Sequence, residues 1–204
     1  MNNQVITISR QFGSGGRLIG QKLAEDMGMG YYDKVLLALA AEKSGLSPDF
    51  IERLEEQASS SFLFNLSTAS QASSNFFYQY DVPLNDKAFF AQAAVIKELA
   101  DKENCVIVGR CAEHILRDRP DCLKVFICAS KETRLKRLID EYGMGEKEAK
   151  DRLDRLDKGR ANYYKHYTGE QWGSIQNHDL CINTDVSGVD GAVALIKTMI
   201  KNMK

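Results

Sequence analysis

The chain has 204 residues, of which 44% are hydrophobic, so one domain with a core of ordinary size is expected over residues 1–204. Its formal net charge of −1 at pH 7 gives no overall field that would attract nucleic acid or an anionic membrane surface. No apolar run approaches membrane-spanning length, and the five cysteines lack the spacing of a zinc site or a disulfide framework. We therefore expect a cytoplasmic protein without nucleic-acid or membrane partners.

The first predicted element is a buried strand over the β-branched run Val5 to Ile8. A glycine-rich turn follows at once, and apolar residues then recur at helical spacing, so a helix is expected to begin near Gly16. A strand, a glycine-rich turn and a helix form a layout that cradles phosphate, because backbone N–H groups approach the anion closely and the helix N-terminus adds partial positive charge. The alternative is a plain turn that holds no ligand. We expect the phosphates of a nucleoside triphosphate to bind at Gly13, Ser14, Gly15, Gly16 and Arg17.

This turn departs from the usual phosphate-binding loop, which reads Gly-x-x-x-x-Gly-Lys-Ser/Thr. With Gly15 at the second glycine, Arg10 stands at the first and Gly16 stands where the lysine belongs. Arg17 falls where a hydroxyl normally holds Mg²⁺. The loop therefore lacks its lysine, and Arg17 is the nearest cation.

Four further strands are predicted at Gly30–Tyr32, Cys105–Val108, 123–128 and Leu180–Asn183. Helices are expected near 17–28, 34–44, 48–57, 86–102, 111–117, 131–141, 145–167 and 188–203. Apolar strands that alternate with helices predict an α/β fold whose parallel sheet is covered on both faces. Ligands of such sheets bind beyond the carboxyl ends of the strands, so that edge is the predicted active site. Three cysteines lie in or beside apolar runs and are expected in the core: Cys105, Cys128 and Cys181.

Several polar residues follow the predicted strands at this edge. Asp33 could orient an acceptor or hold a metal-bound water, or it could cap the helix that begins at Lys34. Arg110 suits a bidentate grip on phosphate, whereas its plain alternative is a surface ion pair with Glu113. Thr184 and Asp185, with Ser187, could meet a nucleotide base or form a turn that caps the last helix.

Residues 145–167 contain the densest group of charges. Arg152, Arg155 and Arg160 could stabilise a phosphoryl group in the transition state. Glu148 and Asp151 precede the first two by four residues, an order that also favours a self-paired, solvated helix. Arg160 has no acid at that spacing, so it is the first choice for a phosphate contact.

Two further segments have more than one interpretation. Tyr163 and Tyr167, one helical turn apart, could stack on a base or pack the helix onto the core. Residues 58–85 are rich in serine and aromatic residues and could cover an acceptor or form an interface between copies of the chain.

The chain resembles the cytidylate kinase-like family, within the P-loop nucleoside monophosphate kinases. The resemblance rests on a series of segments that span most of the chain in the family's order: 6–16, 31–34, 106–110, 125–137, 151–164 and 182–185. It implies a three-layer P-loop NTPase fold with a five-stranded parallel sheet, an acceptor-binding insertion at 58–85 and a helical lid at 145–167. It also implies that one of the two basic residues after the fourth strand, Arg134 or Arg137, helps to hold phosphate, and Arg134 is the candidate.

The resemblance further implies an ATP-dependent kinase that uses Mg²⁺ and transfers the γ-phosphoryl group to a small acceptor. A nucleoside monophosphate such as CMP is the expected acceptor. Family members carry lysine where Gly16 stands and threonine where Leu18 stands, so Arg17 and Ser14, the latter as a metal ligand, are the candidate replacements. The alternatives are a nucleotide-binding sensor with little transferase activity and a kinase that acts on a non-nucleotide metabolite.

Overall fold

The computed structural model describes residues 3–45 and 84–203. At its centre is a five-stranded sheet with the strand order β2-β3-β1-β4-β5, in which every adjacent pair is parallel. All five predicted strands are therefore confirmed. Their bounds are Val5–Arg10 for β1, Gly30–Tyr32 for β2, Cys105–Val108 for β3, Cys122–Cys128 for β4 and Leu180–Asn183 for β5.

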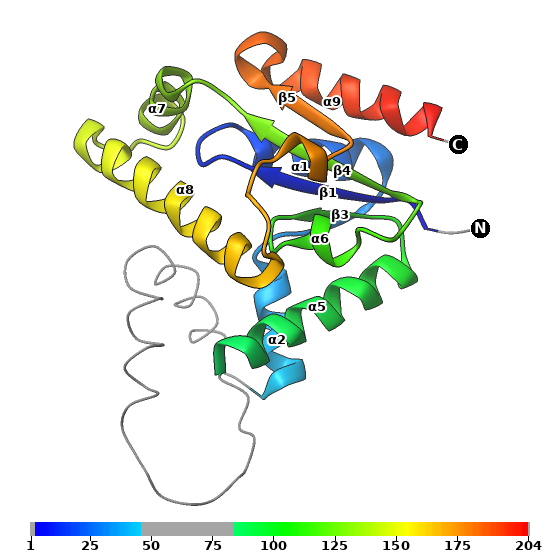
Figure 1. Ribbon diagram of the computed structural model, residues 1–204. Coiled ribbons are helices and arrows are strands. Elements are labelled where there is room, and N and C mark those ends of the chain that lie inside the picture. Colours follow the sequence, from blue (N-terminus) through cyan, green and yellow to red (C-terminus); the bar gives the residue numbers. More distant parts are fainter. Residues whose placement is uncertain (1–2, 46–83, 204) are drawn as a thin grey trace, which may run out of the picture.

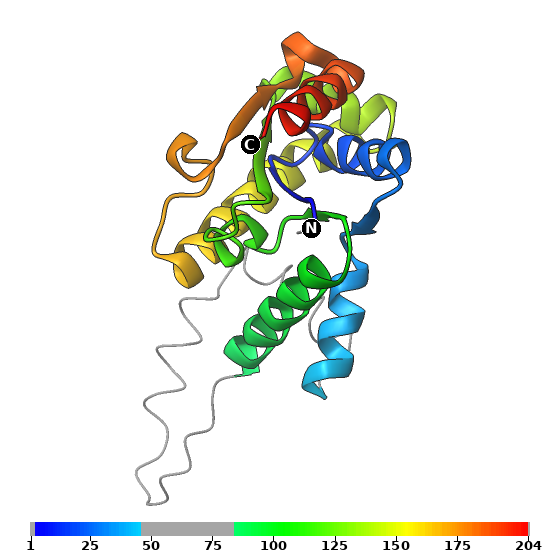
Figure 2. The same cartoon turned by 90° about the vertical axis from the view of Figure 1, so that its right-hand side faces the viewer.

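Helices cover both faces of the sheet, which gives the expected three layers (Figures 1 and 2). Helices α1 (Gly16–Met27) and α9 (Thr184–Asn202) pack on one face, where Ile6, Ile8 and Val125 belong to one buried cluster with Ile19 of α1. The other face carries α2 (Val35–Ser44), α5 (Leu84–Lys102) and the short α6 (Ala112–Ile115). The central strands are buried on both sides, which explains why their sequences are continuous apolar runs.

Two helices lie at the carboxyl ends of the strands instead of on a face. Helix α7 spans Lys131–Asp140 and α8 spans Glu146–Thr168. Figure 1 shows α8 running past the ends of the β-strand arrows, so its side chains border the edge where ligands bind in such sheets. A 3₁₀ turn at Ile175–Asn177 then leads into β5.

Several predicted bounds differ from the structure. Strand β1 continues to Arg10, two residues beyond the predicted end, because Arg10 still pairs with Ile127 of β4. The last helix begins at Thr184 and is kinked at Gly188, whose φ of 63° interrupts the helical backbone. Cys181 is exposed, so its predicted core position is wrong. Strand β5 lies at the edge of the sheet and pairs with one strand only, β4, so it is less covered than the central strands. The helix predicted at 48–57 and nearly all of 58–85 lie outside the described residues.

In the described parts of the chain, no helix combines the length and apolar character of a membrane span.

Candidate active site

The glycine-rich turn connects β1 to α1 as predicted. Gly13 and Gly15 have φ angles of 77° and 87°, a left-handed conformation that side chains with a Cβ rarely adopt. Helix α1 has no side-chain cap and no acidic residue in its first turn. Its N-terminal partial positive charge is therefore not offset locally, which suits an anion.

The interior of the turn is held by one hydrogen bond within the turn and one from a distant part of the chain. The Ser14 hydroxyl is buried and donates to the Gln11 carbonyl at 2.8 Å. Thr184, also buried, donates to the Ser14 carbonyl at 2.9 Å. Thr184 thus supports the phosphate loop, a role that sequence reasoning did not assign to it. The metal-ligand role of Ser14 stays a prediction, and it would require the hydroxyl to leave its bond with Gln11.

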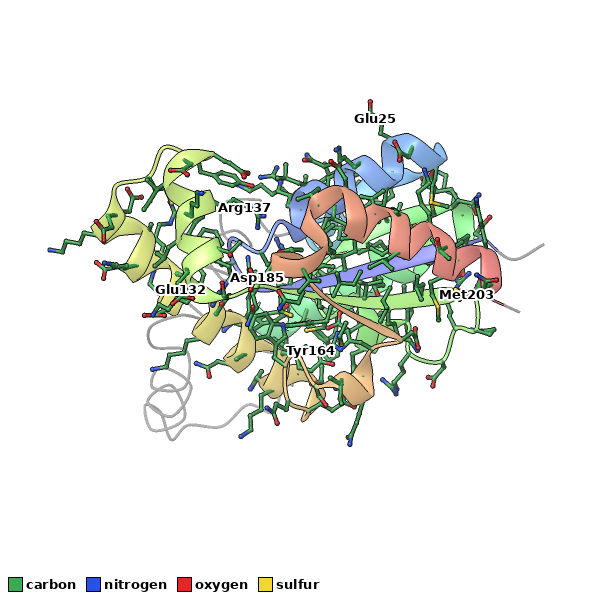
Figure 3. The ribbon with its side chains drawn as sticks, turned by 90° about the horizontal axis from the view of Figure 1, so that it is seen from above. Glu25, Glu132, Arg137, Tyr164, Asp185 and Met203 are labelled. Atoms are coloured by element: carbon green, nitrogen blue, oxygen red, sulfur yellow. The ribbon has the colours of Figure 1, made fainter. Side chains whose placement is uncertain are left out.

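Helices α7 and α8 hold the other side of the turn. Asp157 of α8 accepts from the Phe12 backbone N–H at 2.7 Å and from the Arg134 guanidinium at 2.5 Å. Arg134 also donates to the Phe12 carbonyl at 3.3 Å, and Arg137 donates to the Gly13 carbonyl at 2.8 Å. Figure 3 shows Arg137 on the side of α7 that faces the loop. Arg134 is therefore a support of the loop in this structure, and its direct contact with phosphate stays a prediction.

Asp33 lies at the end of β2 and forms ion pairs with two arginines. Its carboxylate is 3.2 Å from Arg17 Nε and 3.6 Å from Arg10 Nη2. Lys34 is the N-cap of α2 and no side chain caps this helix, so the capping interpretation of Asp33 is wrong for its side chain. Burial and the nearby Asp33 carboxylate raise the pKa of Tyr31, whereas Arg17 lowers it. Asp33 and Arg17 are thus brought together at the carboxyl edge.

The backbone after β3 is unusual. Gly109, Arg110 and Cys111 have successive φ angles of 79°, 64° and 54°. Left-handed conformations cost free energy for residues other than glycine, and they cluster at functional sites. Arg110 is buried, with 8% of its surface exposed, so the alternative that placed it in an ion pair at the surface is wrong about its location.

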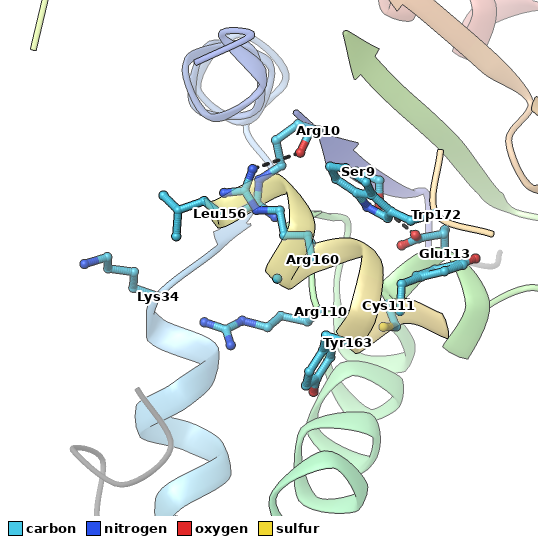
Figure 4. A pocket seen from close by; sticks show the side chains of 13 residues that line it. Ser9, Arg10, Lys34, Arg110, Cys111, Glu113, Leu156, Arg160, Tyr163 and Trp172 are labelled. Atoms are coloured by element: carbon cyan, nitrogen blue, oxygen red, sulfur yellow. Dashed lines mark hydrogen bonds between the residues drawn. The ribbon is translucent and has the colours of Figure 1, made fainter. Parts of the chain in front are cut away.

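A cavity of about 190 Å³ opens between the strand ends and α8. Figure 4 shows four basic side chains at this cavity, two of which, Arg110 and Arg160, were predicted from the sequence. The other two are Arg10 and Lys34, which sequence reasoning did not select. Arg160 donates to the Arg10 carbonyl at 3.0 Å and lies 3.7 Å from Asp157. The residues that line the cavity are Ser9, Arg10, Lys34, Gly109, Arg110, Cys111, Glu113, Leu156, Gly159, Arg160, Tyr163, Tyr164 and Trp172.

The other two arginines of α8 do not line this cavity. Arg152 pairs with Glu148 at 3.4 Å, as the acid-then-base spacing predicted, and its guanidinium lies 6.0 Å from the Phe12 ring centroid. Arg155 is exposed. Their role in a lid stays a prediction.

Aromatic side chains form the wall of the cavity on the α8 side. Tyr167 stacks on Phe89 at 4.0 Å between ring centroids, so it packs α8 against α5. Tyr163 and Tyr164 both line the cavity, and Tyr164 is buried. The packing interpretation is therefore confirmed for Tyr167.

A buried carboxylate lies at the inner end of the cavity. Glu113 is 2% exposed and accepts from the Ser9 hydroxyl at 2.6 Å. His178 Nε2 is 4.0 Å from the same carboxylate oxygen, and His178 Nδ1 lies 2.8 Å from the Ser174 carbonyl. No local pattern marks this group, because its members come from three distant segments of the chain.

Asp185 and its neighbours are engaged with the protein at the far end of this edge. Asn183 caps α9 by accepting from the Asp185 N–H at 3.0 Å, and Asp185 accepts from the Ser130 N–H at 2.8 Å. Hydrogen bonds, that from Thr133 above all, lower the pKa of Asp185. Thr184 and Asp185 thus belong to the first turn of α9, whose cap is Asn183, so the interpretation of these residues as the cap is wrong, and their contact with a nucleotide base stays a prediction.

The described residues contain no group of three or more His, Cys, Asp or Glu side chains that could hold a metal. Mg²⁺ in kinase sites needs less than this, because it keeps several waters and takes one or two carboxylates together with substrate phosphates. Asp33, whose carboxylate pairs with Arg17 and Arg10, is the carboxylate considered from the sequence for a metal-bound water, and that role stays a prediction.

The parallel sheet, the glycine-rich turn into α1 and the basic cavity at the strand ends define a P-loop kinase fold. A shikimate kinase structure from Bacteroides thetaiotaomicron has the same fold, with a TM-score of 0.52 and 15% identity over 97% of this chain and 98% of that one. An uncharacterised protein from Eubacterium ventriosum is similar over 98% of this chain and 99% of its own, with a TM-score of 0.70 and 30% identity.

The model of the cytidylate kinase-like family matches residues 5–186, and the chain belongs to this family. A curated cytidylate kinase from Methanoculleus marisnigri is 25% identical over 118 residues. That match covers 58% of this chain and 63% of the relative, which is less than two thirds of the relative's length.

Proposed function

We propose that this protein transfers the γ-phosphoryl group of ATP, with Mg²⁺, to a small anionic acceptor, and that a nucleoside monophosphate such as CMP is that acceptor. The observation that carries the proposal is the cavity beside the glycine-rich turn, where basic side chains from separate elements converge. Such a cluster neutralises the negative charge of two phosphate-bearing molecules that must approach each other. The family and the identity to the cytidylate kinase support the same conclusion.

In the proposed reaction, an acceptor oxygen forms a bond to the γ-phosphorus while the bond from that phosphorus to the bridging oxygen breaks. ADP leaves with the electrons of that bond. A phosphate acceptor is already deprotonated, so no base is required, whereas Asp33 would take the proton of a hydroxyl acceptor. Catalysis then consists of positioning and charge stabilisation.

The predicted residues of the turn and of the cavity have defined parts in this proposal. The turn at Gly13–Gly16 holds the donor phosphates, and Arg17 supplies a cation beside them. Arg110 and Arg160 hold the acceptor's anionic group from two sides of the cavity. Bound Mg²⁺ would neutralise charge on the donor phosphates.

The second candidate is a kinase whose acceptor is a smaller, non-nucleotide metabolite that carries an anionic group. The volume of the cavity favours it, because about 190 Å³ is below the roughly 300–1,000 Å³ of pockets that enclose drug-sized ligands.

ADP release from Mg·ATP tests both candidates, with CMP, dCMP, UMP, AMP and GMP as separate acceptors and a panel of polyol acids beside them. Arg110→Ala is the site variant. Arg117→Ala is the matched control, because Arg117 is exposed and pairs with Asp118 away from the cavity. Acceptor-dependent release that falls only in Arg110→Ala supports the proposal. ATP binding without release for any acceptor would contradict it and favour a nucleotide sensor.

A further inference from the structure

The missing lysine at position 16 raises the question of which group supplies its charge. Position 16 is the first residue of α1, where the loop motif requires lysine. Lysine in this motif reaches the β- and γ-phosphates. Gly16 has no side chain, so the positive charge that lysine would bring to the phosphates has to come from another residue of the fold.

The side chain of Arg10 fills the space into which a residue at position 16 would project. A Cβ placed on Gly16 would lie 2.5 Å from Arg10 Cβ and 2.9 Å from Arg10 Cγ. These atoms are the fixed base of the Arg10 side chain, so rotation of its distal end would not relieve the contact. A lysine at 16 and the observed Arg10 are therefore mutually exclusive in this backbone.

A second glycine makes room for the charged end of the same side chain. A Cβ on Gly109 would collide with Arg10 Nη1. Gly16 begins α1 and Gly109 follows β3, and the Arg10 side chain passes between them. Two elements that are remote in sequence thus leave space for one arginine.

The guanidinium ends at the proposed reaction centre. Arg10 lines the basic cavity, and its Nη2 lies 3.6 Å from the Asp33 carboxylate. Its side chain is 20% exposed, which leaves it reachable by a ligand. Arg160 fixes the backbone beneath it by donating to the Arg10 carbonyl at 3.0 Å (Figure 4).

We infer that Arg10 replaces the absent lysine and contacts the phosphoryl group during transfer, an inference that rests on the proposed function. Arginine offers a planar fork of N–H donors that can hold two phosphate oxygens, whereas lysine offers a point charge. The bonds made and broken are those of the proposed reaction, and Arg10 changes only the charge and hydrogen bonding around the transferred group.

Exchange of the two positions tests this inference. Arg10→Ala removes the cation, and Arg10→Lys keeps a charge. Gly16→Lys adds the usual lysine against Arg10, and Arg10→Gly with Gly16→Lys restores the first glycine and the lysine of the ordinary motif while Arg17 stays in place. Arg117→Ala is the matched control. Each variant is assayed for kcat and KM, for the affinity of the non-hydrolysable β,γ-imido analogue of ATP with Mg²⁺, and for thermal unfolding.

Arg10→Ala is expected to lower kcat/KM by about 10²–10³-fold, the usual effect of removing one group that stabilises transition-state charge. Affinity for the analogue is expected to fall about tenfold, because a charge-assisted hydrogen bond is lost. Gly16→Lys alone is expected to be impaired, and the double variant is expected to recover at least tenfold over Arg10→Ala in both measurements.

Two results would overturn the inference. One is an Arg10→Ala variant that binds the analogue and turns over within about threefold of the parent protein, because a removed charge contact with phosphate costs more than that. The other is a double variant that melts at the parent temperature yet recovers nothing. Absence of turnover in the parent protein would instead refute the proposed function, and the affinity measurements would still decide the role of Arg10.

Discussion

Asp157 is predicted to be the largest single electrostatic contributor to the integrity of the phosphate loop. Its carboxylate accepts hydrogen bonds from Arg134 and from the Phe12 N–H, and both ion-pair partners are largely covered, with side-chain exposures of 18% for Asp157 and 9% for Arg134. Removal of one member of a buried ion pair costs about 3–5 kcal/mol because the remaining charge is left uncompensated. Partial exposure places Asp157→Ala near the lower end, at about 3 kcal/mol.

Asp157→Asn keeps an oxygen for the Phe12 N–H but loses the charge, so we expect an intermediate loss of about 1.5–2 kcal/mol. Urea unfolding followed by circular dichroism measures these changes in the free energy of unfolding. Asp154→Ala is the matched control on the same helix: its partner is Lys131 and both side chains are about half or more exposed, at 67% and 48%. An exposed pair contributes about 0–1 kcal/mol, so this variant should stay close to the parent protein.

The double variant Asp157→Ala with Arg134→Ala should lose less stability than the sum of the two single variants, because neither member of the Arg134–Asp157 pair is then left buried without the other. A loss below about 1 kcal/mol for Asp157→Ala would refute the reasoning, since it would put the pair in the class of solvated surface pairs. So would equal losses in Asp157→Ala and the Asp154→Ala control.

Three further predictions concern single contacts. Thr184→Val removes the hydrogen bond to the Ser14 carbonyl, so it should lower the free energy of unfolding by about 1–2 kcal/mol, measured by urea unfolding, and weaken binding of the ATP analogue, measured by calorimetry. Unchanged binding would show that Thr184 does not support the phosphate loop. Gly109→Ala should displace Arg10 and strain a backbone whose φ is 79°, lowering stability by about 1–3 kcal/mol and kcat/KM together; a fully active, stable variant would contradict it. Burial, with a bond to Glu103, raises the pKa of Tyr32 to about 12, so the folded state keeps a proton that the unfolded state loses near pH 10. Stability should therefore fall between about pH 10 and 12, and Tyr32→Phe should reduce that slope in unfolding curves; an unchanged slope would exclude Tyr32 as a cause.

Much of the fold could be predicted from local patterns. The runs that form β1, β3 and β4 are apolar because both faces of a central parallel strand are covered, and this requirement is visible in any short window. The rule that ligands bind at the carboxyl ends of strands then placed Asp33 and Arg110 at one edge, where the structure has them. Less could be predicted at the edge strand β5, where Cys181 is exposed.

The candidate site was only partly accessible in this way. Spacing made Arg160 the first choice for a phosphate contact, and among the three arginines of α8 it is the one that lines the cavity. Spacing did not exclude Arg152 and Arg155, because the orientation of a helix depends on what the helix packs against. Glu113 and His178 were missed because a buried group shared among remote segments leaves no periodic signal.

The sequence by itself therefore determined the order of strands and helices, the glycine-rich turn and the absence of its lysine. Only the tertiary structure decided which cation occupies the space beside Gly16 that a lysine side chain would need. The Arg10 side chain takes that space because Gly16 of α1 and Gly109 after β3 leave room for it. It likewise decided that Asp157 and Thr184 hold the loop in place. The physical reason is range: backbone conformation follows from neighbouring residues, whereas the direction and charge environment of a side chain follow from whatever the fold packs around it.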